Sequence, residues 1–124
     1  MNNINIGKIG EEIANNYLGA NKYMILARNH RERSDEIDII ARNNKGTLVF
    51  CEVKTINNKS GYFNEFMPED NLSNIKRHKM IRAAEAFIGQ HPWLVRDGAG
   101  WQIDLIAVVL QEEKLINLRH YENI

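Results

Sequence analysis

Residues 36–55 constrain the fold more than any other part of this sequence. They contain two apolar runs, 36–41 and 47–55, separated by the polar segment 42–46, which ends in a glycine. Apolar runs of this length around a polar, glycine-containing break predict two strands joined by a turn. Apolar residues occupy both faces of both strands, which indicates a sheet that is covered on both sides.

Three charged residues, Asp38, Glu52 and Lys54, interrupt this apolar stretch. Side chains alternate across a strand, so Glu52 and Lys54 are expected on one face of the second strand. A hairpin that turns at 42–46 places Asp38 close to Glu52. Burying such charges without partners costs on the order of several kcal/mol, so a divalent cation or mutual pairing has to compensate.

The same alternation predicts which residues of the two strands share a face. On the second strand, Phe50 is expected beside Glu52, with Cys51 on the opposite face as a buried thiol. On the first strand, Asp38 and Ile40 are expected on one face and Ile37 on the other.

An acidic residue followed two positions later by lysine is a weak signal by itself. It is expected about once by chance in a chain of this composition. The pattern also occurs at Glu112 and Lys114, in a segment that reads as a solvated turn. A cross-strand salt bridge on an exposed face is the ordinary alternative. Placement inside an apolar strand, with Asp38 on the neighbouring strand, favours a functional site for Glu52 and Lys54.

The rest of the sequence predicts two helices and further strands. Helical spacing of apolar residues predicts a helix over 4–18, in which Gly7 and Gly10 indicate a close approach of another element. A second helix is expected to start at a cap formed by Asp70, Asn71 or Ser73 and to end near residue 88. Strands are expected at 23–27, 101–110 and 114–120, and the basic segment 28–35 reads as a loop.

These elements give the order αβββαβ(β), an α/β fold with a mixed central sheet flanked by helices. A chain of 124 residues is expected to form a single domain over 1–124. No stretch approaches the roughly 18 apolar residues needed to cross a bilayer. The lone cysteine fits a reducing compartment, so we expect a cytoplasmic protein.

Four blocks of sequence, in this order and spacing, resemble a known family. They are 7–14 with Tyr17 and Leu18, 23–29, 36–41 and 49–55, with weaker matches at 76–77, 83–84 and 103–107. The chain resembles the YraN-like family of small predicted endonucleases, which belongs to the PD-(D/E)xK superfamily and is similar to archaeal Holliday-junction resolvases. The resemblance implies a restriction-endonuclease-like core and a metal-dependent endonuclease that hydrolyses DNA phosphodiester bonds.

The resemblance also implies roles for individual residues. Asp38 and Glu52 would be metal ligands, Lys54 the catalytic lysine and Glu11 an accessory acidic residue. Carboxylates suit a hard ion such as Mg²⁺ or Mn²⁺. One departure lies just before residue 36: the family usually has glycine where this chain has Ser34 and Asp35, and the added carboxylate could perturb metal binding.

Two basic clusters are candidates for binding DNA phosphates, although Lys plus Arg equals Asp plus Glu at 16 each. Because no base-reading motif accompanies them, the clusters favour recognition of branched or damaged DNA over recognition of a defined sequence. The alternative is that each cluster is an ordinary solvated charged face. A homodimer would supply two sites for cutting two strands. The alternative function is a nucleic-acid-binding module that keeps the nuclease fold without robust catalysis. The clusters are Arg28, His30, Arg31 and Arg33, and Lys76, Arg77, Lys79 and Arg82.

Other candidate residues carry weaker signals. Packing is favoured over base stacking for Trp93 and Trp101. Asp104 lies in an apolar strand, either as a partner of the site or as a pairing site for arginine or lysine. The four histidines have no metal-ligand spacing, which disfavours structural zinc.

Overall fold

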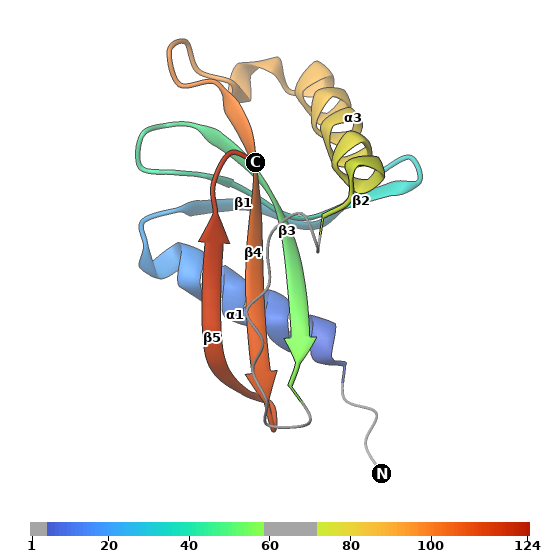
Figure 1. Cartoon of the computed structure of the whole chain (residues 1–124). Helices are drawn as coiled ribbons and strands as arrows, with labels where there is room; N and C mark the ends of the chain where they lie inside the picture. Colours follow the sequence, from blue (N-terminus) through green and yellow to red (C-terminus); the bar gives the residue numbers. More distant parts are fainter. Residues whose placement is uncertain (1–4, 59–71) are drawn as a thin grey trace.

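The computed structural model describes residues 5–58 and 72–124. Along the chain lie α1 (Ile6–Ala20), β1 (Met24–Glu32), β2 (Asp35–Arg42), β3 (Leu48–Asn57), α3 (Asn74–Gln90), the short 3-10 helix η1 (Pro92–Leu94), β4 (Trp101–Gln111) and β5 (Lys114–Tyr121) (Figure 1). The order of α-helices and strands is the predicted one. No helix in these two ranges is long and apolar enough to cross a membrane.

The five strands form one sheet in the order β1-β2-β3-β4-β5. Strands β3 and β4 run parallel, and the other neighbouring pairs are antiparallel. Parallel neighbours need a long crossover, and the chain between β3 and β4 includes α3. The mixed sheet predicted from the sequence is therefore confirmed.

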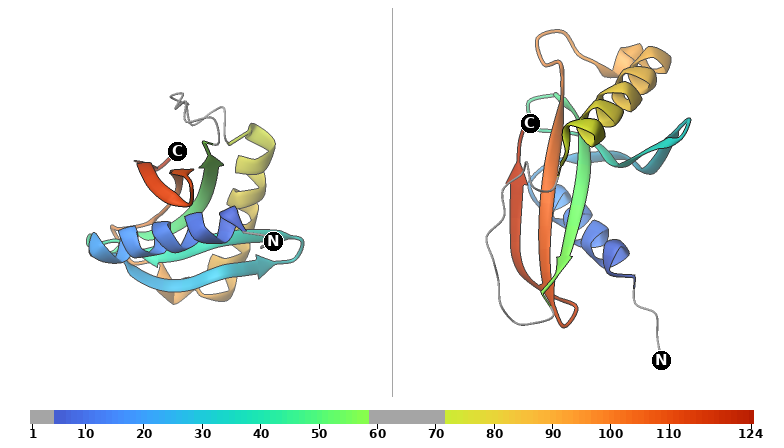
Figure 2. Two further views of the ribbon diagram at one scale, coloured as in Figure 1. Left: turned by 90° about the horizontal axis from the view of Figure 1, so that it is seen from below. Right: turned by 45° about the vertical axis from the view of Figure 1, so that its right-hand side comes forward.

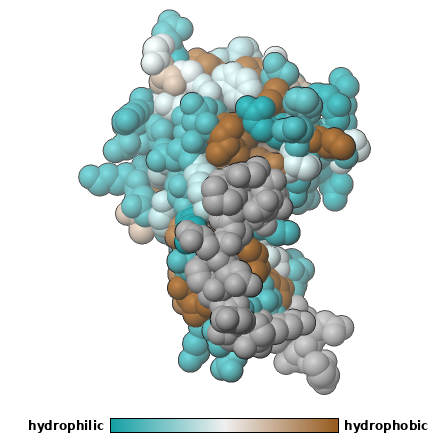
Figure 3. Space-filling view, viewed as in Figure 1, coloured by the Kyte–Doolittle hydropathy of each residue, from teal (hydrophilic) through white to brown (hydrophobic). Residues whose placement is uncertain are grey.

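A helix covers each face of the sheet (Figure 2). On one face α1 packs its predicted apolar stripe, including Ala14 and Leu18, against a core that contains Cys51. On the other face α3 packs Met80 and Phe87 against residues of β2, β3 and β4. Cys51 is fully buried, as expected for a core thiol. On the face visible in Figure 3, hydrophobic residues form separate patches among hydrophilic ones.

Residues 28–32 continue β1, so the loop predicted for 28–35 is wrong over most of its length. Arg28 pairs with Ile39 and Arg31 with Glu36, which leaves a tight turn where Arg33 has a φ of 57°. Because β1 is an edge strand, its polar side chains can face solvent while its backbone pairs with β2. The polar side chains of residues 28–32 therefore led to a loop prediction for what is the second half of β1.

The hairpin of β1 and β2 bends next to Asp38. Ile37 and Ile40 both lie in the core under α3, although alternation predicted opposite faces for them. The alternation in β2 therefore changes at Asp38, and opposite this position in β1 Asn29 adopts a left-handed φ of 51°. The hairpin then projects past the sheet beside α3 (Figure 2).

Helix starts follow the sequence signals. Asn5 caps α1 by accepting a hydrogen bond from the Lys8 N–H at 3.1 Å, and Ser73 caps α3 in the same way. Of the three caps predicted for the second helix, Ser73 is the one observed, and the other two lie outside the described residues.

Gly10 lets α1 approach β3 closely. A Cβ atom built at Gly10 would overlap the Thr55 side chain, with its Cγ2 only 2.7 Å away. Even a methyl group would therefore force α1 away from the sheet. This is the close approach that the sequence indicated for Gly10.

Replacing Gly10 by alanine is expected to destabilise the protein by about 1–3 kcal/mol, because the added methyl overpacks the contact with Thr55. Gly19→Ala is the matched control: Gly19 lies inside α1, and a Cβ there would have no atom of the described residues within 4 Å. That control should be neutral or stabilising by up to about 1 kcal/mol. Urea unfolding followed by circular dichroism measures both, and equal stabilities for the two variants would contradict the prediction.

Candidate functional site

Strands β2 and β3 separate at the two predicted carboxylates. Their antiparallel ladder ends at the pair Ile39 and Cys51, one position before Asp38 and Glu52. Beyond this point each strand continues with its other neighbour, β2 with β1 and β3 with β4. The Asp38 carboxylate fills the opening by accepting a hydrogen bond from the Val53 N–H at 2.8 Å. The structure thus brings Asp38 next to the segment that carries Glu52, as the hairpin predicted.

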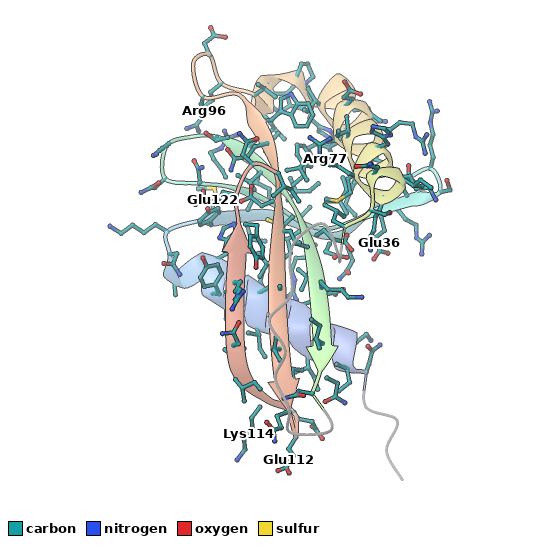
Figure 4. All side chains as sticks on the ribbon, viewed as in Figure 1. Glu36, Arg77, Arg96, Glu112, Lys114 and Glu122 are labelled. Carbon is teal, nitrogen blue, oxygen red and sulfur yellow. The ribbon has the colours of Figure 1, made fainter. Side chains whose placement is uncertain are left out.

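A hollow of about 300 Å³ lies at this separation, between the strands and the start of α3. Figure 4 shows Glu36, one of its lining residues, below the amino-terminal end of α3. The lining therefore concentrates carboxylates from the strands beside lysines from the helix. The lining residues are Ser34, Asp35, Glu36, Asp38, Glu52, Lys76, Lys79 and Met80.

Negative charge accumulates in this hollow and perturbs Asp38. Burial, together with the charge of the nearby Glu52 carboxylate, raises the pKa of Asp38 to about 7. Glu11 and Glu36 act in the same direction, while the hydrogen bond from Val53 opposes them. A carboxyl group in this environment is stabilised by a proton or by another cation.

Lys76 of α3 already supplies one cation. Its ammonium group forms an ion pair with the Glu52 carboxylate, whose side chain is only 10% exposed. The sequence placed Lys76 in a basic cluster for DNA, and its spacing on the helix gave no sign of a contact with β3. The pair depends on how α3 lies across the sheet, so it could not be predicted from the sequence.

Glu11 reaches the electrostatic field of this hollow from α1. Partial burial raises the pKa of Glu11, and the charges of Glu36 and Glu52 add to that effect. Glu11 itself lines a separate hollow, together with Lys8, Glu12, Arg28 and Asn29. In that hollow Glu12 pairs with Arg28 at 3.1 Å.

Lys54 is exposed on β3 and is not among the residues that line the hollow. By alternation it lies on the same side of the strand as Glu52, and Phe50 of that side is in the core under α3. The structure therefore brings together two of the three charged residues that define the sequence pattern and leaves the lysine in solvent.

The predicted basic clusters adjoin the hollow but are partly neutralised. Arg31 pairs with Glu36 at 3.8 Å, and Arg82 pairs with Asp35 at 3.5 Å. The added acidic residue at position 35 thus faces α3. Lys79 lines the hollow itself. Arg31 from the hairpin and Lys76, Lys79 and Arg82 from α3 therefore lie at this opening, whereas Arg28 lines a separate hollow beside Glu11. Arg33 lies in the hairpin turn, and Arg77 is half-buried on α3 (Figure 4).

Within residues 5–58 and 72–124, no group of three or more His, Cys, Asp or Glu residues is arranged to hold a metal ion. Asp38 and Glu52 offer two carboxylates on one hollow. Two carboxylates suit an ion such as Mg²⁺, which keeps several water ligands and is commonly bound by one or two acidic side chains. The donor set therefore fits a hydrated divalent ion better than a fully enclosed one.

The remaining sequence candidates have separate outcomes. Trp101 packs against Phe50, with ring centroids 5.8 Å apart, as predicted. Trp93 lies outside the core, at 70% exposed, but its ring packs edge-on against His91 with centroids 5.4 Å apart. Asp104 pairs with His120 at 2.6 Å, a partner that the sequence did not indicate.

Solved structures resemble the chain only distantly. A protein of unknown function, SPO1766 from Silicibacter pomeroyi, is 13% identical with a TM-score of 0.39, covering 99% of this chain and 77% of that one. SfsA from Pyrococcus furiosus, solved in complex with Ca²⁺, is 14% identical with a TM-score of 0.36, covering 94% and 62%. Neither likeness is close enough to indicate a function.

Sequence relatives are much closer. UPF0102 proteins from Chloroherpeton thalassium and Persephonella marina are 34% identical over 112 residues and 40% identical over 105 residues. These matches cover 90% and 83% of this chain, and 81% and 82% of the relatives. A UPF0102 protein from Geobacter metallireducens is 38% identical over 123 residues, covering 99% of this chain and 93% of its own. The sequence model described as "Uncharacterised protein family UPF0102" matches residues 10–108, and the chain therefore belongs to that family.

Proposed function

We propose that this protein is a cytoplasmic, divalent-metal-dependent endonuclease that hydrolyses DNA phosphodiester bonds, with a preference for branched or damaged DNA. The observation that carries the proposal is the hollow where β2 and β3 separate. There Asp38 and Glu52 lie beside two lysines of α3, and mutual repulsion and burial raise the pKa of Asp38. Such clusters of perturbed charge are typical of catalytic sites.

In this proposal Asp38 and Glu52 hold a hydrated Mg²⁺ or Mn²⁺ ion. When bound, the ion would lower the pKa of a water molecule and neutralise charge that develops on the phosphoryl oxygens. The Val53 N–H keeps the Asp38 carboxylate in position. Glu11, whose pKa is raised by partial burial and by the neighbouring acidic groups, would add an acidic group on the α1 side.

The lysines would act on the DNA phosphate. Lys79 already lines the hollow, and Lys76 would be released from Glu52 when a metal ion takes over the carboxylate. Both ammonium groups could then stabilise the negative charge of the phosphate in the transition state. Lys54, which is exposed next to Glu52 on β3, would orient the attacking water once DNA covers it.

The flanking basic residues would bind the phosphate backbone on either side of the cut. Arg31 and Arg82 pair with the lining residues Glu36 and Asp35 and so lie beside the hollow. Arg28, Arg33 and Arg77 would extend this contact along the hairpin and α3. Backbone contacts of this kind position DNA without reading its sequence. A homodimer would place two such hollows on one branched substrate.

A nucleic-acid-binding module without robust catalysis is the second candidate. Two observations favour it: Lys54 does not line the hollow, and Lys76 neutralises Glu52. This candidate predicts DNA binding that does not depend on a metal ion. Calorimetry that shows no Mn²⁺ binding, together with retained binding of four-way DNA, would establish it over the nuclease.

Asp38→Asn, Glu52→Gln and Lys54→Ala should each lower DNA cleavage by about 100-fold or more, because each removes a ligand or a charge needed in the transition state. The assay compares linear, nicked, flapped and four-way DNA with Mn²⁺. Glu112→Gln is the matched control, since Glu112 and Lys114 repeat the sequence pattern in the turn between β4 and β5, far from α3 (Figure 4). Full cleavage activity in the first three variants would contradict the proposal.

The stability of the metal-free protein should fall as pH rises through about 7, the pKa of folded Asp38. The ordinary value is 3.8, so folding favours the protonated carboxyl, and that stabilisation is complete below 3.8 and lost above 7. The expected loss is on the order of 2–4 kcal/mol. Urea unfolding in chelator at pH 5 and pH 8 measures it. Asp38→Asn should remove most of this pH dependence of the unfolding free energy. An unchanged pH dependence in that variant would refute its assignment to Asp38.

Lys76→Met should tighten Mn²⁺ binding by about three- to tenfold, because Lys76 competes with the metal ion for Glu52. The same variant should cleave DNA more slowly, since a positive charge near the phosphate is lost. Lys79 lines the same hollow, so Lys79→Met serves as the control and is expected to leave the metal affinity unchanged. Titration calorimetry gives both affinities. Weaker metal binding by Lys76→Met would contradict the competition between Lys76 and the metal ion for Glu52.

A further inference from the structure

A second hollow, of about 340 Å³, lies at a different place on the fold. It is formed by the end of α1, the turn between β2 and β3, and the ends of β4 and β5. In the part of the chain that the structure describes, no residue lines both this hollow and the one at Asp38. In Figure 4 its lining residue Glu122 lies beside the end of β5, across β3 and β4 from Glu36. Nothing in the proposed DNA chemistry uses this hollow.

A buried hydrogen-bonded chain forms its floor. Asp104 is fully buried and lies 2.6 Å from Nε2 of His120. The other ring nitrogen of His120, Nδ1, lies 2.8 Å from the Tyr17 hydroxyl. With Asp104 ionised, His120 donates through Nε2 and accepts the Tyr17 O–H at Nδ1. The Tyr17 oxygen then keeps lone pairs available for a hydrogen bond from a ligand.

Further hydrogen bonds fix this arrangement. Asp104 also accepts from Gln102 Nε2 and from the Asn123 N–H, each at 2.9 Å. These bonds tie the end of the chain to β4 and α1, which is a structural role. That role does not require an open polar hollow, yet Tyr17, Gln102 and His120 all line one. A network with all of its members held in place is the support that a binding site needs.

The lining has both aromatic and amide groups. Tyr17 and Tyr23 lie against the His120 ring, with centroid distances of 5.5 and 5.9 Å. Aromatic rings of this kind provide surfaces on which any nucleobase can stack. The side-chain amides of Asn43 and Gln102 also line the hollow. Asn43 Oδ1 accepts from the N–H groups of Lys45 and Thr47, and Gln102 Nε2 donates to Asp104, so Asn43 Nδ2 and Gln102 Oε1 are the atoms that would meet a base edge.

Charge limits what the hollow can accept. Among the described residues of its lining, Lys45 is the one lysine or arginine, and Glu122 lies in the same lining. One ammonium group suits a single phosphate rather than a polyphosphate chain. A glutamate accepts a hydrogen bond from an exocyclic amine, as in contacts to cytosine. The polar character of this lining excludes a lipid or another purely apolar ligand.

We infer that this hollow is a binding site for one nucleotide, with the base against Tyr17 and Tyr23 and the phosphate at Lys45. Two sources can supply the same chemistry: a free nucleoside monophosphate and the phosphorylated end of a DNA strand. Binding here does not depend on metal or on cleavage at Asp38.

The test is an NMR titration of ¹⁵N-labelled full-length Asp38→Asn protein in chelator, with adenosine and cytidine monophosphates, the two nucleosides and inorganic phosphate as probes. Saturable shifts at Tyr17, Lys45 and His120 are expected with the monophosphates. Lys45→Ala should weaken monophosphate binding by about tenfold, the effect of one charge-assisted hydrogen bond, and leave nucleoside binding unchanged. Lys114→Ala, at the start of β5, is the control and should change neither.

Three outcomes would overturn the inference: no saturable shifts, shifts confined to the hollow at Asp38, or binding of inorganic phosphate as tightly as the monophosphates.

A 5′-phosphorylated tetranucleotide distinguishes the two sources of the nucleotide. Tighter binding than the monophosphate identifies a strand end, and equal or weaker binding identifies the free nucleotide. Tyr17→Phe keeps the ring and removes the hydroxyl, and weaker nucleoside binding by that variant would support the role of the buried chain. Since the protein used lacks Asp38, a negative result here leaves the nuclease proposal standing, and a positive result does not require it.

Discussion

Buried negative charge at the separation of β2 and β3 is the constraint on which the rest of this structure depends. A carboxylate such as Asp38 loses most of its hydration when the sheet is covered on both faces, and Glu52 adds a like charge nearby. The structure offsets this with the Val53 N–H and with Lys76, whose contact requires α3 to start above β3. The position of α3 is thus linked to the charge that it neutralises.

The separation of the strands also lets both faces of the sheet act on one place. Helix α1 lies on one face and α3 on the other, and a continuous sheet would insulate one from the other. Where the ladder ends, Glu11 of α1 is affected by Glu52, which itself contacts α3. Gly10, the residue before Glu11, allows the close approach that brings this part of α1 onto β3. A packing requirement and an electrostatic one therefore meet in adjacent residues.

Much of the fold could be predicted from the sequence because each element carries its own periodicity. The apolar stripe of α1, the alternating faces of β3 and the cap at Ser73 are local patterns, and the structure has all three. The pairing of Asp38 with the Glu52 segment followed from one hairpin. Local patterns failed where backbone pairing overrode side-chain polarity, as in β1, and where a bend changed the face of Ile37.

The sequence by itself determined the order of elements, the sheet covered on both sides and the two carboxylates on neighbouring strands, because hydrophobic periodicity and short turns act over a few residues. Only the tertiary structure decided which charges meet. Lys76 reaches Glu52 through the placement of α3, and His120 joins Tyr17, 103 residues away in sequence, through the pairing of β5 with β4. Such contacts depend on how complete elements pack against one another. Local sequence patterns extend over a few residues and do not specify contacts between residues so far apart in the sequence.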